Sequence, residues 1–336
     1  MKEFLNKYDT VIFDLDGVIT SEQCYWDAAA LTVWEYLHSD MYIGNGKISV
    51  DELNADYKKI RDTVFCNDRI IYTLKGKGVN SNWDLAYVTI LVSIILSENN
   101  FEKILEYTEN MSDDILKEYD FLACKAAEKC GGREEDYLRS GIIWKKIQNC
   151  FQEWFLGDEI YCELYGKEPL TSGKKGLVHY EQPVIEIEKV RAVINELSKT
   201  KRLCTATGRI FSEMNKPFTE WDIKKYFSPD GLCNFDHVTE AEKKLNTTLT
   251  KPHPYMFLKA LYGTDYEDEK LLNGDYDKAK IEKTLIVGDA GADILAAKAM
   301  GADFCAVLTG VSGQAARDYF VELKAEYILN SIADFI

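Results

Sequence analysis

The 336-residue sequence is poor in the residues from which several common kinds of protein are built. Six prolines and four histidines leave little material for a proline-rich linker or a histidine-rich metal site. Lysine and arginine total 40 against 56 aspartates and glutamates, which gives a formal net charge of −16. Because nucleic-acid phosphates are held by clustered basic side chains, this balance argues against a nucleic-acid partner. It does not argue against a small anionic ligand held by a cation and a few local charges.

Paired cysteines and long apolar runs are also missing. The nine cysteines form no Cys-x-x-Cys pair, so we expect reduced, packed thiols in a cytoplasmic protein and neither a disulfide framework nor a zinc site. The longest near-continuous apolar run, residues 85–96, is shorter than the roughly 20 helical residues that span a bilayer. We therefore expect a buried helix in this run and no membrane partner.

The sequence does contain an alternation of short β-rich runs and helical segments. The runs that predict strands are 9–14, 201–207, 284–287, 304–308 and 327–329. This alternation predicts an α/β fold, in which a Rossmann-like parallel sheet forms the core and helices cover both of its faces.

Residues 21–182 have a different pattern, with helical periodicity, many aromatic side chains and few strand-like runs. We interpret this stretch as an all-helical cap domain, inserted after the first strand. The core domain would then comprise residues 1–20 and 183–336. Within the core, the acidic stretch 262–283 is expected to be a solvated surface loop.

Two carboxylates follow the first predicted strand. Asp14 and Asp16 are separated by one residue, and side chains two apart in an extended segment point to the same side. Like charges held this close require a cation between them or a proton on one of them. On their own, the two residues are equally compatible with a turn capped by an aspartate.

Three further polar segments lie where predicted strands end or helices begin. Asp289 and Asp293 are four residues apart and can share one face of a helix, although acidic residues at a helix start also act as simple caps. Lys251 precedes a predicted helix, and 207–209 follow the second long strand; either segment could be an ordinary helix start or turn. Open α/β sheets bind ligands at the edge where strands end, so the four segments together predict one site.

The order of these segments resembles the four motifs of the haloacid dehalogenase-like superfamily. They read Val-Ile-Phe-Asp-Leu-Asp-Gly-Val-Ile, Ala-Thr-Gly-Arg, Lys-Pro-His-Pro and Ile-Val-Gly-Asp followed by Asp-Ile-Leu. The resemblance covers residues 8–22 and 183–312. The helical insertion is similar to an enlarged version of the cap found in phosphoglycolate-phosphatase-like members.

The resemblance implies a phosphoryl-transfer site with a role for each motif. Asp14 would be the nucleophile that forms an aspartyl-phosphate, and Asp16 the general acid and base. The residues implied to bind phosphate are Thr207, Gly208, Arg209 and Lys251, of which Thr207 and Lys251 would also assist catalysis. The residues implied to hold Mg²⁺ are Asp14, Asp16 through its backbone carbonyl, Asp289 and, directly or by steadying the shell, Asp293.

The expected function is a Mg²⁺-dependent phosphatase acting on a small phosphorylated metabolite. Dehalogenases of the superfamily lack the second aspartate, so Asp16 favours phosphoryl transfer over carbon–halogen cleavage. One alternative is a phosphomutase, although β-phosphoglucomutase-like members carry a histidine where this chain has Trp26. Another is a catalytically silent binding protein on the same fold, against which the four intact motifs argue.

Substrate selection is expected in the inserted domain. Lys77, Asn80 and Trp83, in the glycine- and lysine-containing segment 75–84, are candidates for substrate contact. The alternative is a surface turn before the apolar helix, capped by Asn82 or Asp84. The aromatic residues of this domain could equally form a dimer interface, so the expected state is a monomer or a homodimer.

Overall fold

The computed structural model describes residues 1–79, 81–112 and 114–336, and the chain divides into two compact units. Met1–Glu22 and Glu181–Ile336 form the first, called the core unit below. Gln23–Tyr180 form the second, called the helical unit. The chain therefore leaves the core unit after its first strand and returns to it later.

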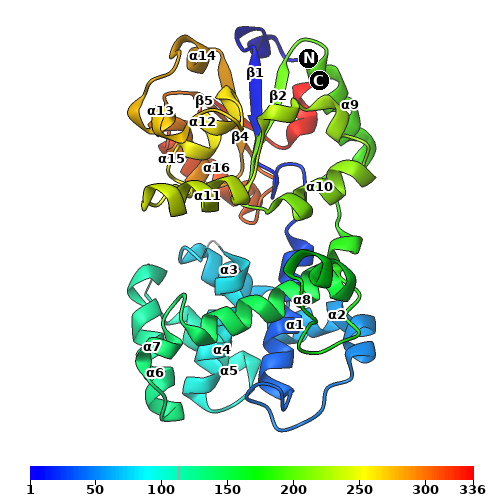
Figure 1. Cartoon of the computed structure of the whole chain (residues 1–336), viewed down its shortest axis with the longest axis vertical. Helices are drawn as coiled ribbons and strands as arrows, with labels where there is room; N and C mark the ends of the chain where they lie inside the picture. The colour runs from blue at the N-terminus through cyan, green and yellow to red at the C-terminus, as the bar shows by residue number, and fades with distance from the viewer. Residues whose placement is uncertain (80, 113) are drawn as a thin grey trace. The chain divides into compact units, whose positions relative to one another are not determined.

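The core unit is built on a six-stranded parallel sheet in the order β3-β2-β1-β4-β5-β6 (Figure 1). The strands are β1 (Thr10–Phe13), β2 (Arg202–Ala206), β3 (Leu232–Cys233), β4 (Thr284–Gly288), β5 (Asp303–Val307) and β6 (Tyr327–Leu329). This is the doubly wound strand order, and it confirms the predicted α/β core. Strand β3 was not predicted from the sequence.

Helices cover both faces of the sheet because neighbouring strand residues point in opposite directions. Val11 and Phe13 pack with α9 and α10, whereas Ile12 packs with α11, α12, α15 and α16 on the other face (Figure 1). The helices of the core unit are α9 (Ile187–Ser198), α10 (Phe211–Glu220), α11 (Phe235–Leu245), α12 (Tyr255–Tyr262), α13 (Asp268–Asn273), α14 (Ala279–Glu282), α15 (Gly291–Met300) and α16 (Arg317–Glu322).

The expectation of a solvated loop at 262–283 is wrong, because this stretch contains helices α13 and α14. Leu271 and Ile281 are buried in the core, while most of the acidic residues around them are exposed. Asp268 also accepts hydrogen bonds from the ammonium of Lys259 at 2.6 Å and the hydroxyl of Tyr255 at 2.7 Å. A few inward-facing side chains thus order a segment whose overall composition is that of a loop.

The helical unit is formed by α1 (Gln23–His38), α2 (Val50–Val64), α3 (Arg69–Gly76), α4 (Asn82–Leu96), α5 (Phe101–Glu109), α6 (Tyr119–Cys130), α7 (Glu134–Tyr137) and α8 (Ile142–Tyr165). The apolar run forms α4, which is buried against α1, α6 and α8 as predicted. Across the described part of the chain, no helix combines the length and the apolar character that crossing a membrane requires.

Glu35, Glu153 and Lys174 form a cluster of charged side chains buried inside the helical unit. Lys174 Nζ is 2.9 Å from Glu35 Oε2 and 2.6 Å from Glu153 Oε2, and all three side chains are fully buried. The indole nitrogen of Trp154 donates a further hydrogen bond to Glu35 Oε2 at 2.7 Å. Since Glu35 belongs to α1 and Glu153 to α8, the lysine joins both helices to the segment that follows α8.

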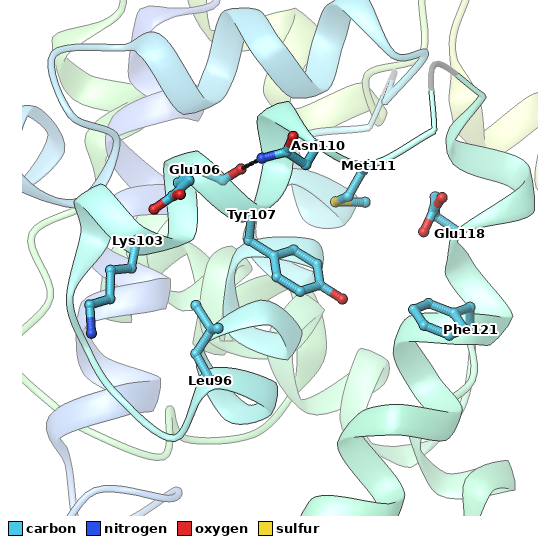
Figure 2. A pocket seen from close by; sticks show the side chains of 8 residues that line it. All are labelled: Leu96, Lys103, Glu106, Tyr107, Asn110, Met111, Glu118 and Phe121. Atoms are coloured by element: carbon cyan, nitrogen blue, oxygen red, sulfur yellow. Dashed lines mark hydrogen bonds between the residues drawn. The ribbon is translucent and has the colours of Figure 1, made fainter.

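The helical unit also contains a hollow of about 480 Å³, lined by residues from 96 to 121 (Figure 2). Leu96, Tyr107 and Phe121 supply apolar surface, and Lys103 and Glu118 supply charge. No residue of this lining is among the site residues that the sequence predicts.

Candidate functional site

The carboxyl ends of neighbouring strands carry the polar residues of the predicted site. Asp14 follows β1, Thr207 follows β2 and Asp289 follows β4. Because β1 pairs with both β2 and β4, these three residues emerge side by side at one edge of the sheet. Lys251 reaches the same point from the turn before α12, and Asp293 from the first turn of α15.

Asp14, Asp289 and Asp293 form an acidic cluster with one lysine. One carboxylate oxygen of each lies within 4.8 Å of the other two. Lys251 Nζ donates to Asp14 Oδ1 at 2.9 Å and forms an ion pair with Asp293 Oδ1 at 2.8 Å. Asp293 Oδ2 also accepts from the backbone N–H of Ala290 at 3.3 Å, so α15 helps to fix its orientation.

Burial and mutual repulsion perturb the ionisation of this cluster. Burial raises the pKa of Asp14 to about 7, although Lys251 opposes the rise and Asp293 adds to it. Burial, Asp293 and Asp14 raise the pKa of Asp289 well above its usual value. Burial alone would lower the pKa of Lys251, but Asp14 and Asp293 outweigh it and raise that pKa. The positive charge of Lys251 alone therefore does not offset the cost of burying Asp14 and Asp289 in their ionised form.

The acidic cluster fits a hard divalent cation such as Mg²⁺. Three ionised carboxylates and one ammonium carry a formal charge of −2. The side-chain atoms that could bind a metal here are all carboxylate oxygens. Glycines surround Asp289: a Cβ on Gly17 would lie 2.2 Å from Asp289 Oδ2, and one on Gly310 would lie 1.9 Å from it. Gly17 and Gly310 thus leave space beside the Asp289 carboxylate, which any larger residue at either position would fill.

Gly310 was not singled out from the sequence, although a signal for it existed. It follows Thr309, whose hydroxyl donates to the carbonyl of Gly17 at 2.5 Å. Both residues come shortly after β5, a strand that the sequence did predict. Applying the strand-end rule to β5 as well would have placed them at the site.

Asp16 has different partners from Asp14. Its Oδ1 accepts from the hydroxyl of Thr20 at 3.0 Å and from Arg209 Nη2 at 2.6 Å. Arg209 is 1% exposed and also pairs with the carboxylate of Glu181. Neither Thr20 nor Glu181 was expected at the site, because single polar residues outside the four motifs carry no sequence signal.

The predicted phosphate-binding residues lie beside these carboxylates. Thr207 is buried, and its hydroxyl accepts from the backbone N–H of Arg209 at 3.2 Å. Gly208 is exposed, with open space where a Cβ would lie. Phosphate binding by Thr207, Gly208, Arg209 and Lys251 stays a prediction.

Two residues that the sequence predicts to contact substrate, Lys77 and Trp83, make contacts within the helical unit. Lys77 is buried and donates to the backbone carbonyl of Met111 at 2.7 Å. Trp83 packs edge-on against Trp144 and Phe151. Asn80 lies outside the described residues, and the helix α4 is capped by Ser81, whose hydroxyl accepts from the N–H of Trp83 at 3.2 Å. Substrate contact by these residues stays a prediction.

Asp84 is tied to residues far along the chain. Its carboxylate accepts from Arg139 Nε at 3.0 and 3.1 Å and from the indole of Trp144 at 2.7 Å, and the side chain is 2% exposed. It therefore joins α4 to the start of α8 and is not the exposed helix cap that the sequence suggested.

Comparison with known proteins agrees with this geometry. Residues 248–335 match the family model described as HAD-hydrolase-like. An X-ray structure from the Northeast Structural Genomics Consortium is 27% identical, with a TM-score of 0.81 and coverage of 97% of both chains. No curated protein matches the sequence.

Two more distant structures have functional names. A putative phosphoglycolate phosphatase from Lactobacillus plantarum is 13% identical, with a TM-score of 0.45 and coverage of 98% of this chain and 97% of its own. A putative β-phosphoglucomutase from Thermotoga maritima is 16% identical, with a TM-score of 0.42 and coverage of 97% of this chain and 95% of its own.

The family match spans Lys251, Asp289 and Asp293 together with the strand between them, and the similarity to the consortium structure extends along the whole chain. Asp14 and Asp16 supply the first motif at the same sheet edge. Residues 248–335 are therefore similar to HAD-like hydrolases, and the chain as a whole shares its fold with the consortium structure.

Proposed function

We propose that the protein is a Mg²⁺-dependent phosphatase that hydrolyses a small phosphorylated metabolite through an aspartyl-phosphate on Asp14. The observation that carries this proposal is the pairing of Asp14 with Lys251 inside a cluster that also contains Asp289 and Asp293. A nucleophilic carboxylate needs a nearby cation to receive a phosphate dianion, and this site provides one ammonium and oxygen ligands for a metal.

In the first step, a carboxylate oxygen of Asp14 attacks phosphorus. The new bond joins Asp14 to phosphorus, and the bond to the leaving oxygen breaks with its electron pair on that oxygen. Asp16 donates its proton to this oxygen, so the product departs as an alcohol. Lys251 keeps Asp14 in place and offsets negative charge during the approach of phosphate.

In the second step, Asp16 takes a proton from a water molecule, and the water oxygen attacks phosphorus and releases Asp14. Thr207 and the N–H of Gly208 would hold the phosphate oxygens in both steps. Asp14, Asp289, Asp293 and the carbonyl of Asp16 would hold Mg²⁺. When bound, the ion would neutralise these carboxylates and stabilise charge on the transferring phosphoryl group.

We also propose that the helical unit selects the substrate. Its segment 75–84 is the part that we expect to alter substrate preference when substituted, with little effect on Mg²⁺ affinity. This part of the proposal rests on the sequence, since the contacts of Lys77 and Trp83 in the structure are with residues of their own unit.

Turnover of p-nitrophenyl phosphate with and without Mg²⁺ tests the proposed activity. We expect release of p-nitrophenolate that stops on chelation and returns when Mg²⁺ is added. Phosphate release from a panel of phosphorylated metabolites would then identify the substrate class. Absence of turnover with any divalent metal between pH 5 and pH 9 would favour a binding protein on the same fold.

A further inference from the structure

Arg209 binds two carboxylates of the core unit at the same time. Its Nε lies 3.1 Å and 3.2 Å from the two oxygens of Asp16, and its Nη2 donates to Asp16 Oδ1 at 2.6 Å. On the other side, Nη1 and Nη2 donate to the two oxygens of Glu181 at 2.7 Å and 2.5 Å. Nη2 also lies 2.9 Å from the hydroxyl oxygen of Thr20. Each of the three guanidinium nitrogens therefore has an acidic partner.

These contacts leave Arg209 poorly placed to bind phosphate. A guanidinium has five N–H donors, and the carboxylates of Asp16 and Glu181 already engage all three nitrogens that carry them. The side chain is 1% exposed, and removing it from Glu181, which is 2% exposed, would leave a buried charge unpaired. The family resemblance implies that Arg209 binds phosphate, and its contacts with Asp16 and Glu181 point to another role.

Asp16 is the accessible member of this group. Its side chain is 27% exposed, against 2% for Glu181 and 1% for Arg209. One Asp16 oxygen also accepts from Thr20, whose position is fixed by its backbone N–H bonded to Leu15 and its carbonyl bonded to Gly17, both at 2.8 Å. Asp16 is thus held from behind by a guanidinium and a hydroxyl, while part of its carboxylate stays open.

Backbone hydrogen bonds also join the two chain segments next to this group. Ser21 N–H donates to the carbonyl of Gln182 at 2.9 Å, and Val184 N–H donates to the carbonyl of Ile19 at 3.0 Å. The segment that leaves the core unit and the segment that returns to it are therefore paired next to Glu181. A rigid pair of segments gives Arg209 a fixed support from which to orient Asp16.

We propose that Arg209 is a positioning residue that orients the carboxylate of Asp16 for proton transfer to the leaving oxygen, with Glu181 and Thr20 holding it in place. This proposal rests on the proposed phosphatase function, in which Asp16 is the general acid. It assigns Arg209 to the leaving group and not to the phosphate.

The two assignments differ in how activity depends on the leaving group. Phenolate is a stronger base than p-nitrophenolate, so phenyl phosphate depends more on a well-placed acid than p-nitrophenyl phosphate of nearly the same shape. We expect Arg209→Lys, whose single ammonium cannot reach both carboxylates and Thr20, to reduce kcat about 10²-fold for phenyl phosphate and less than about tenfold for p-nitrophenyl phosphate. KM values and inhibition by inorganic phosphate should stay near those of the wild type.

Arg202→Met is the matched control, because it removes a partly exposed arginine from the start of β2, the strand that Arg209 follows, where Arg202 pairs with Asp230 at 2.9 Å. It should change the ratio of the two rates little. Equal loss on both substrates in Arg209→Lys, with weaker inhibition by phosphate, would overturn the proposal and support a phosphate ligand.

A wild-type protein that hydrolyses neither ester would count against the proposed function alone. The crystal structure of Arg209→Lys then decides the positioning role. The proposal predicts that the Asp16 carboxylate moves away from the hydroxyl of Thr20 while Lys251 keeps its contacts with Asp14 and Asp293. An Asp16 carboxylate that keeps its wild-type position would overturn it.

Discussion

Asp14 and Asp16 lie two residues apart, yet a different cation holds each of them. Lys251 holds Asp14 in the acidic cluster, and Arg209 holds Asp16 beside Thr20. A nucleophile and an acid must act on opposite bonds of the same phosphorus, so they benefit from separate supports. This difference in partners is the structural basis for giving the two carboxylates different roles.

Gly310 should be required for metal binding because of the space that it leaves. In Gly310→Ala, the added methyl group would lie 1.9 Å from Asp289 Oδ2 and would displace that carboxylate. We expect Mg²⁺ affinity to fall by at least about tenfold, as it does when groups that orient metal ligands are disturbed. Calorimetric titration with Mg²⁺ measures it. Gly76→Ala is the control, because nothing lies within 4 Å of its added Cβ, and equal affinities for the two variants would contradict the explanation.

Asp27 should make the stability of the protein depend on pH. Burial raises the pKa of this carboxyl to about 6, although Arg61, 3.4 Å away, opposes the rise. The folded state holds the proton of Asp27 more tightly than the unfolded state, so the protonated carboxyl stabilises the fold. This contribution to the free energy of unfolding is complete below the ordinary pKa of about 3.9 and is lost as pH rises through about 6. A pKa of about 6 in place of about 3.9 corresponds to a loss of about 3 kcal/mol in the free energy of unfolding between pH 3 and pH 8.

Urea unfolding of Asp27→Asn as a function of pH measures this contribution. The amide cannot ionise, so the variant should lose most of that pH-dependent difference in the free energy of unfolding. Asp62→Asn, which changes an exposed carboxylate of the same unit, should behave like the wild type. A pH dependence unchanged in Asp27→Asn would show that Asp27 does not contribute it.

At the level of elements, the buried lysine that joins α1 and α8 should be important for stability. Lys174→Met leaves Glu35 and Glu153 buried without their cation, and breaking a buried ion pair in this way costs about 3–5 kcal/mol. Tryptophan fluorescence reports unfolding in urea, because five of the six tryptophans, among them Trp154, lie in this unit. Lys145→Met removes an exposed lysine from α8 and should have little effect.

The double variant Glu153→Gln, Lys174→Met tests the cause of this loss. It removes one of the two uncompensated charges, so it should be more stable than Lys174→Met alone. A single variant within about 1 kcal/mol of the wild type would show that the three buried charges do not depend on each other.

Elements with a strong local pattern were predictable from the sequence, and elements fixed by distant contacts were not. Strands β1, β2, β4 and β5 are apolar runs that end in turns, and α4 is a long apolar run capped by Ser81. Strand β3 has only two residues, Leu232 and Cys233, which is too short for a period to show. Helices α13 and α14 depend on two buried side chains within an acidic stretch.

At the scale of the whole molecule, the same distinction applies to the site. The four motifs could be found because each stands at a strand end or a helix start. Thr20 and Glu181 could not be found in this way. Thr20 contacts Arg209 across 189 positions of sequence, and Glu181 lies outside any motif. Lys77 and Trp83 were singled out by unusual local composition. The structure shows their contacts within the helical unit, and substrate contact by them stays a prediction.

Trapping the phosphoenzyme tests the central claim of this account most directly. In Asp16→Asn, a substrate with a good leaving group such as p-nitrophenyl phosphate should still phosphorylate Asp14, while hydrolysis of the aspartyl-phosphate is slowed because no base activates water. Mass spectrometry of acid-quenched protein should then find phosphate on the peptide that contains Asp14, only when Mg²⁺ is present, and none in Asp14→Asn. Phosphate on another residue, or at least a tenth of wild-type turnover in Asp14→Asn, would contradict the account.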